Sequence, residues 1–138
     1  MLNGEYSFAM NPKFRAYHKK EKKMYQVLSL EFKPDGLEVT IGSEDEYIGK
    51  YGLDDIVLMQ WTGRNDAKGV KVFEGDVVFS RQPHATKHLV VWEEKRCAFY
   101  LFSIDGRARY DVGYKMNAGA MKVLGNVFEH PELLKEKP

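Results

Sequence analysis

The sequence holds a single cysteine, Cys97, and no long apolar stretch. One cysteine excludes an intramolecular disulfide, and the apolar residues 98–102 beside it predict a buried, inert thiol. No stretch approaches the roughly 20 apolar residues that span a bilayer, so no membrane association is expected. Residues 1–12 lack a basic region followed by an apolar block and predict no secretion signal. We therefore expect a cytoplasmic protein.

A surplus of charge of one sign is also missing, because 21 lysines and arginines face 20 aspartates and glutamates. A dedicated nucleic-acid-binding protein usually has a clear basic surplus. The charges are nevertheless unevenly placed, since residues 13–33 are mainly basic and residues 35–66 mainly acidic. Two solvated faces are the simplest interpretation. A basic segment beside an acidic one also suits self-association or a charged protein partner about as well as it suits DNA.

Length and composition are sufficient for a folded core. The chain has 138 residues, of which 43% are hydrophobic and 13% aromatic. A chain of this size buries roughly two thirds of the surface that its unfolded form exposes. We expect one domain over residues 1–138, with two small lobes sharing a core as the variant of this interpretation. Residues 1–12 are expected to be a flexible or loosely packed segment.

Alternation of apolar and polar residues dominates the chain and predicts β-strands. Residues 25–32 and 37–41 flank a Pro-Asp-Gly turn at 34–36 and predict a β-hairpin. A preceding hairpin is expected to have the charged run 18–23 at its tip. Further strands are expected at residues 56–61, 70–73, 77–79, 89–92, 98–102 and 121–128.

The C-terminal part adds a bulge and a helix. Gly125 lies inside the expected last strand and predicts a bulge or a close approach. Pro131 is suited to the first position of a short helix over residues 130–134. Residues 42–55 and 103–118 are expected to be long loops. The many short strands predict a mainly β fold, either a small antiparallel β-barrel or a sandwich with SH3-like barrel elements and a short C-terminal helix. An α+β fold is the alternative.

Three segments of the sequence resemble the YopX family of phage and prophage proteins. They are a Phe-Arg-Ala block within residues 13–25, the run Leu-Met-Gln-Trp-Thr-Gly-Arg-Asn-Asp-Ala-Lys-Gly at 58–69 leading into 72–78, and residues 123–134. The resemblance implies a β-rich fold with barrel-like parts, encoded by a phage or prophage and present in a host bacterial cell. It supplies no catalytic residues.

The second of these segments holds the most specific motif and suggests a polar groove. Its candidate residues are Gln60, Thr62, Asp66, Glu74 and Asp76. Alternation could aim the carboxylates of Glu74 and Asp76 to one side, although acid–base chemistry needs a further partner that the sequence does not identify. The structural interpretation is favoured, because Thr and Asp satisfy turn backbone groups and glycines stand where strands end or bend.

Histidines give little support for a metal or for nucleophilic catalysis. His84 and His88 have a spacing that converges only on a helix, whereas a proline precedes them and a strand is expected after them. His18 and His130 are isolated and are expected in solvent-exposed loops. We therefore predict no metal, no cofactor and no catalytic residue.

Residues 13–23 interleave cations with aromatic side chains, as proteins that bind single-stranded nucleic acid do. A solvated lysine-rich hairpin tip explains the same pattern. The candidate nucleic-acid residues are Arg15, Tyr17, Lys19, Lys20, Lys22 and Lys23.

Three classes of function remain in order of support. The first is a non-catalytic module for interaction or self-assembly, expected as a homo-oligomer or in complex with a phage or host protein. Nucleic-acid binding through residues 13–23 is the alternative, and catalysis ranks third.

Overall fold

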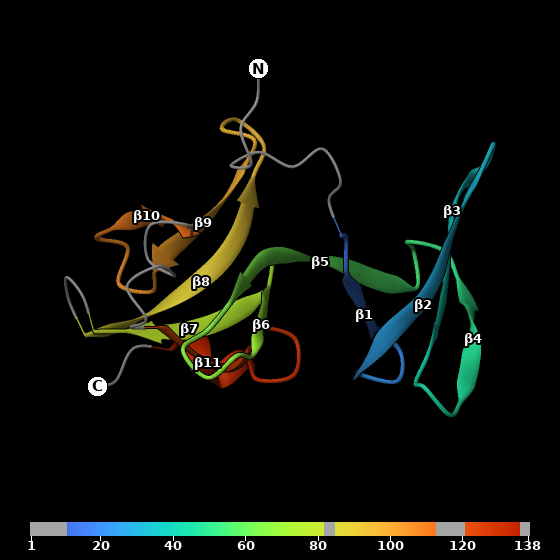
Figure 1. The fold of residues 1–138 in the computed structure, drawn as a ribbon, viewed down its shortest axis with the longest axis horizontal. Coiled ribbons are helices and arrows are strands. Elements are labelled where there is room, and N and C mark those ends of the chain that lie inside the picture. Colours follow the sequence, from blue (N-terminus) through green and yellow to red (C-terminus); the bar gives the residue numbers. More distant parts are fainter. Residues whose placement is uncertain (1–10, 82–84, 113–120, 136–138) are drawn as a thin grey trace, which may run out of the picture.

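The protein consists of two antiparallel β-sheets (Figure 1). The structure is a computed structural model that describes residues 11–81, 85–112 and 121–135. One sheet has the strand order β4-β3-β2-β1-β5-β6 and the other β10-β9-β8-β7-β11. The elements are β1 (Phe14–His18), β2 (Lys23–Lys33), β3 (Gly36–Gly42), β4 (Tyr47–Tyr51), β5 (Ile56–Asn65), β6 (Lys71–Phe73), β7 (Asp76–Ser80), β8 (Thr86–Glu93), β9 (Ala98–Ser103), β10 (Arg109–Asp111), β11 (Met121–Asn126) and the 3-10 helix η1 (Pro131–Leu134).

Two separate hydrophobic cores divide the described residues into two lobes. The N-terminal lobe comprises β1 to β4 with the first half of β5, and its core centres on Ala16, Val39, Ile41 and Ile56. The C-terminal lobe comprises the end of β5, β6 to β11 and η1. Its buried core residues are Val72, Val78, Val90, Leu101, Val112 and Met121.

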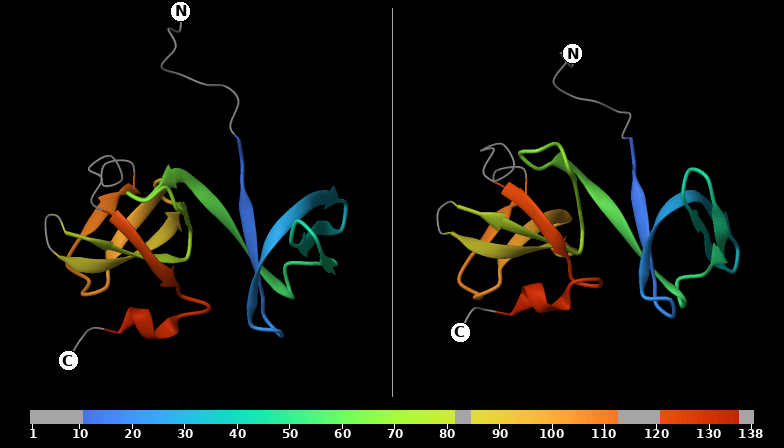
Figure 2. Two further views of the ribbon diagram at one scale, coloured as in Figure 1. Left: turned by 60° about the horizontal axis from the view of Figure 1, so that its bottom comes forward. Right: turned by 90° about the horizontal axis from the view of Figure 1, so that it is seen from below.

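Strand β5 runs from one lobe into the other (Figure 2). Its first half pairs with β1, in the register Ala16 to Leu58, and its second half pairs with β6, where Trp61 lies opposite Phe73. Side chains of a strand alternate between its two faces. Ile56 and Leu58 therefore face the N-terminal core, whereas Met59 points to the other face and lies next to Gly75 of the C-terminal lobe.

Side chains along β1 also alternate between the N-terminal core and the C-terminal lobe. Ala16 is fully buried in the N-terminal core, and His18 packs edge-on against Tyr51 at 4.6 Å between ring centroids. Arg15 and Tyr17 point to the opposite face, toward the C-terminal lobe. The expectation of an exposed His18 is thus wrong, because His18 is the last residue of β1 and its side chain is buried against Tyr51.

Most of the predicted architecture is confirmed. The fold is mainly β and antiparallel, with little helix, and both predicted N-terminal hairpins form. The two sheets resemble a sandwich rather than a closed barrel. The register of β11 shifts between Val123 and Gly125, as expected of a bulge, and the C-terminal helix is the single turn η1.

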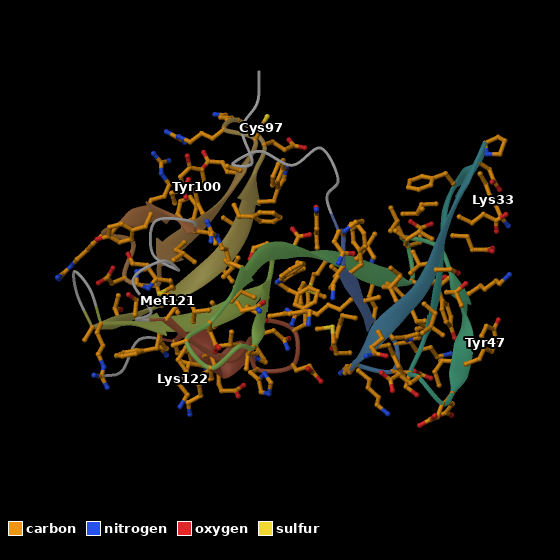
Figure 3. The ribbon with its side chains drawn as sticks, viewed as in Figure 1. Lys33, Tyr47, Cys97, Tyr100, Met121 and Lys122 are labelled. Carbon is orange, nitrogen blue, oxygen red and sulfur yellow. The ribbon has the colours of Figure 1, made fainter. Side chains whose placement is uncertain are left out.

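Three local predictions are corrected. Residues 42–55 contain strand β4, and residues 103–118 contain β10, with 113–120 outside the described residues. Cys97 is exposed (Figure 3). It occupies the turn between β8 and β9 with φ of 51°, and this turn directs the thiol outward instead of into the apolar strand that follows. Among the described residues, no helix is long and apolar enough to cross a membrane.

Gly125, the residue after the bulge in β11, leaves no room for a side chain. A Cβ atom on Gly125 would lie 2.5 Å from Nδ1 of His130 and 2.9 Å from a methyl carbon of Leu133. His130 Nδ1 in turn accepts a hydrogen bond from the backbone N–H of Asn126, at 3.2 Å. The missing side chain therefore lets η1 fold back onto β11.

We predict that Gly125→Ala lowers the free energy of unfolding by about 1–3 kcal/mol, the usual cost of overpacking. Gly52→Ala is the matched control, because a Cβ there would meet nothing within 4 Å. Urea unfolding followed by circular dichroism compares the two variants. Equal stabilities of the two variants would contradict the packing explanation.

Candidate functional site

Arg15 connects the two lobes through a buried ion pair. Its Nη2 lies 2.7 Å from Oδ1 of Asp76, and the side chains of these residues are 16% and 1% exposed. The contact is an ion pair rather than an aligned hydrogen bond. Nη2 also donates to the carbonyl of Glu74 at 3.3 Å, and the guanidinium lies 4.7 Å from the centroid of the Phe73 ring. One side chain of β1 thus contacts three residues at the β6–β7 turn, Phe73, Glu74 and Asp76.

An aromatic stack adjoins this ion pair. Tyr17, the next outward residue of β1, stacks on Phe128 with 5.2 Å between ring centroids. A Cβ on Gly75 would lie 3.1 Å from Sδ of Met59 and 3.4 Å from the Phe128 ring. Gly75 has φ of 86°, so it both makes the turn and leaves room for this packing. Arg15 and Tyr17 therefore belong to the contact between the lobes.

Burial changes the acidity of Asp76. Desolvation raises its pKa above the ordinary value of 3.8, although the charge of Arg15 and the N–H of Phe73 both act in the opposite direction. That N–H donates to Oδ2 of Asp76 at 2.8 Å. The carboxylate is therefore held by its own turn and by Arg15 together.

The polar residues of the predicted groove form backbone contacts of the β5–β6 hairpin. The N–H of Gln60 donates to Oε1 of Glu74 at 3.0 Å, and the N–H of Glu74 donates to the carbonyl of Gln60 at 3.0 Å. Thr62 Oγ1 donates to the carbonyl of Val72 at 2.8 Å. The carboxylates of Glu74 and Asp76 accordingly accept from different partners and do not converge on one point.

Asp66 shields an edge of the second sheet. Its Oδ1 accepts from the N–H groups of Lys68 and Val70, both at 2.9 Å, and its Oδ2 accepts from the N–H of Val123 in β11 at 3.0 Å. Burial acts to raise the pKa of Asp66, but the three backbone hydrogen bonds together lower it below 3.8. The side chain therefore fixes the loop after β5 onto β11, and covering a strand edge in this way prevents unwanted pairing.

The structure thus brings Glu74 and Asp76 together with Arg15 and leaves Asp66 at a separate place. Within residues 11–81, 85–112 and 121–135, no group of three His, Cys, Asp or Glu side chains is arranged for a metal ion. His84 lies outside these ranges, and His88 is buried against Tyr110.

A groove between the lobes was not predicted from the sequence. It has a volume of about 930 Å³, and its walls come from β1 and β2 on one side and from β6 on the other. Lys13, Arg15 and Lys71 line it together with Glu44. Its remaining lining is Pro12, Phe14, Met24, Tyr25, Gln26, Val27, Leu28, Ser29, Leu30 and Phe73.

Leu28 is the most informative of the apolar lining residues. It lies at the register shift between Val27 and Ser29 in the pairing of β2 with β3, so it falls out of the alternation that packs Val27 and Leu30 against the N-terminal core. Its side chain is 46% exposed. The partial break of the alternation within residues 25–32 is the one sequence signal that points to this groove.

The lysine-rich hairpin tip is exposed, as predicted. Lys19, Lys20, Lys22 and Lys23 are all exposed, and Lys19 Nζ donates to the backbone carbonyl of Asp54 at 2.9 Å. The tip borders a hollow of about 620 Å³ that Asp54 and Asp55 also line. Of the six candidate nucleic-acid residues, these four lysines are thus separated from Arg15 and Tyr17, which contact the other lobe.

The opposite pKa shifts of the two buried aspartates predict opposite pH dependences of stability. For Asp76 the folded pKa is raised, so its contribution is present below pH 3.8 and is lost as pH rises through the folded pKa. For Asp66 it is lowered, so the contribution is present above pH 3.8 and is lost as pH falls through the folded pKa.

Asp76→Asn and Asp66→Asn remove these titrations and serve as controls for each other. We expect the unfolding free energy of the wild type minus that of Asp76→Asn to fall with rising pH, and the corresponding difference for Asp66→Asn to rise. Urea titrations between about pH 2 and pH 7 measure both differences. Slopes of the same sign would show that one of the assigned environments is wrong.

Comparisons with known proteins agree with this architecture. The crystal structure of protein EF1440 from Enterococcus faecalis superposes with a TM-score of 0.59 at 24% identity, covering 92% of this chain and all of that one. Protein yopX from Bacillus subtilis superposes with a TM-score of 0.61 at 18% identity, covering 91% and 100%. No curated protein matches the sequence. The family model described as YopX protein matches residues 13–135. The chain therefore belongs to the YopX family.

Proposed function

We propose that this protein is a non-catalytic interaction module of a phage or prophage, and that it binds an acidic, partly apolar segment of a partner protein in the groove between its lobes. The observation that carries the proposal is the composition of this groove. Cations and half-exposed apolar side chains line it together, and this combination suits a peptide that carries both carboxylates and apolar anchors.

Charge sets the preference for an acidic segment. Asp76 neutralises Arg15, so the remaining charge of the lining comes from Lys13 and Lys71 against the single carboxylate of Glu44. Lys71 is exposed, whereas Lys13 lies 5.6 Å from the centroid of the Trp61 ring. A carboxylate bound near either lysine gains a favourable interaction that also steers its approach.

The apolar side chains supply the affinity. Leu28 and Phe73 lie on opposite walls, and Met24 also lies on the β2 wall. Burial of such side chains is worth roughly 1.5–3 kcal/mol each when it is complete. A few apolar anchors flanked by one or two charge pairs describe a typical interaction site.

Catalysis has less support than binding. The carboxylates that could act as acids or bases are engaged in the framework, Asp76 with Arg15 and Phe73, and Glu74 with the backbone of Gln60. General acid–base chemistry needs a group that is free to reach a substrate.

Affinity capture from phage-infected cells tests the proposal with matched variants. Leu28→Glu and Lys71→Glu change the groove without touching the core, and we expect them to reduce capture of a specific partner by about tenfold or more. Leu53→Glu is the control, because Leu53 is exposed to a similar extent (52% against 46% for Leu28) but lies outside the groove. A partner captured equally well by all three variants would refute binding in the groove.

Nucleic-acid binding is the second candidate function, and the observation that favours it is the exposed turn with four lysines. None of the ion pairs between described side chains involves Lys19, Lys20, Lys22 or Lys23. Their charges are therefore available to phosphates, although the carboxylates of Asp54 and Asp55 lie close by.

If this second function holds, the protein retards single-stranded DNA in a gel at low salt. The logarithm of the binding constant then falls linearly with the logarithm of the salt concentration, with a slope of about −0.7 per phosphate contacted. Replacing Lys19, Lys20, Lys22 and Lys23 by Glu abolishes the shift. The lysines at 68, 71, 87 and 122 offer a control set for the same change of net charge. Absence of a shift at low salt, or equal loss in both sets, would end this proposal.

A further inference from the structure

The most exposed large apolar side chain among the described residues is Phe32, at 83% exposure. It lies at the end of β2, next to the turn that leads into β3, and opposite Leu37 in the register of this hairpin. Its ring therefore extends from the rim of the N-terminal core. An exposed aromatic ring at a hairpin end is a typical anchor for a pocket on another molecule.

The surroundings of Phe32 are acidic. Residues 31–38 carry the carboxylates of Glu31, Asp35 and Glu38 against the single ammonium group of Lys33. Lys33 Nζ lies 3.2 Å from Glu38 and 3.9 Å from Glu31. Its one positive charge therefore offsets only part of the negative charge of these carboxylates. We call Phe32 and these flanking charges, at the end of the β2–β3 hairpin, the hairpin tip; it is distinct from the lysine-rich tip of the β1–β2 hairpin.

The C-terminal lobe offers a hollow of the complementary character. Its volume is about 770 Å³. The apolar side chains of Phe79, Ile104, Leu124 and Leu133 line it, and Lys87 and Arg107 supply the positive charge. Ala85, Thr86 and Asp105 complete the lining.

Of the two cations of the hollow, Lys87 Nζ donates to the backbone carbonyl of Lys135 at 2.9 Å, whereas Arg107 is accessible. The side chain of Arg107 is 84% exposed, and its contact with Asp105 is long, at 3.9 Å. Asp105 also accepts hydrogen bonds within its own turn, from Ser103 Oγ at 2.7 Å and from the N–H of Arg107 at 3.0 Å. Arg107 therefore retains donors for a second carboxylate.

The hairpin tip and the hollow lie at opposite ends of the molecule. Figure 3 labels Lys33 at the outer end of the N-terminal lobe and Lys122 on β11, the strand that contributes Leu124 to the hollow. Figure 1 shows the two sheets side by side along the longest axis, with the hairpin on one flank and β7 and β11 on the other. The tip of one chain therefore meets a hollow only on another chain.

We propose that Phe32 of one copy docks in the hollow of a second copy, with the acidic residues of its hairpin tip against Lys87 and Arg107. Such a head-to-tail contact joins two different surfaces and repeats from copy to copy, so it either closes into a ring of copies or continues as an open chain. A single hairpin tip buries little surface, which makes the contact weak and dependent on concentration. It uses surfaces other than the groove and holds or fails independently of binding there.

Sedimentation velocity over concentrations up to roughly 0.5 mM tests the association, because interfaces below about 1,200 Å² are typical of weak encounters. The wild type is expected to increase in mean mass with concentration. Phe32→Ser is expected to weaken association about 10–30-fold, the effect of removing an anchor residue. Tyr47→Ser is the control, because Tyr47 is an aromatic residue with 62% exposure on β4. A monomeric wild type, or an equal effect of the two variants, would overturn the proposal.

An exchange of charges identifies the two surfaces. The double variant Glu31→Lys/Asp35→Lys makes the tip basic, and Lys87→Glu/Arg107→Glu makes the hollow acidic. Each variant alone has like charges on both surfaces and is expected to stay monomeric. An equimolar mixture is expected to regain association, because every tip then finds a hollow of opposite charge. With both variants folded by circular dichroism, a mixture that remains monomeric would refute the pairing of these surfaces.

Discussion

The ion pair of Arg15 with Asp76 determines how the two lobes are placed. It joins the outward face of β1 to the turn between β6 and β7, segments that are 59 residues apart in the contact of Arg15 with Glu74. Removing two charges from water costs more than their attraction returns unless the geometry is good, and the raised pKa of Asp76 reflects that cost. We therefore assign the pair chiefly to specificity, because it favours one arrangement of the lobes over others in which these charges would be unpaired.

The rest of the connection follows from this arrangement. β5 pairs with β1 in the N-terminal lobe and with β6 in the C-terminal lobe, so the lobes share a strand, but each buries its own core. Between the cores lie the Tyr17–Phe128 stack and the side chain of Met59, which fill the space beside the ion pair. Gly75 suits this point, since its positive φ makes the turn that presents Asp76 and a Cβ there would crowd Sδ of Met59 at 3.1 Å. Packing and charge thus specify the same orientation.

Local patterns predicted the local structure well. The hairpins, the bulge at Gly125 and the turn at Pro131 depend on neighbouring residues, and all are present. The roles of Asp66 and Arg15 depend on partners 57 and 59 residues away, which a single sequence does not reveal. The groove and the exposed ring of Phe32 escaped prediction for a related reason. Alternation indicates which face of a strand is apolar, but it does not indicate where the opposing layer ends.

The ion pair of Arg15 with Asp76 fixes the distance between the two walls of the groove. Its walls are β1 and β2 on one side and β6 on the other, and Arg15 spans from the first wall to the turn that follows the second. A residue that holds the walls together cannot be used to probe binding, since its loss alters the site and the fold at once. Leu28 differs in this respect, because the bulge removes it from the core and leaves it in the groove. Because of the irregularity of β2, a substitution of Leu28 changes the groove without changing the contact between the lobes. Binding in the groove can therefore be measured with variants of Leu28 while the two lobes keep their arrangement.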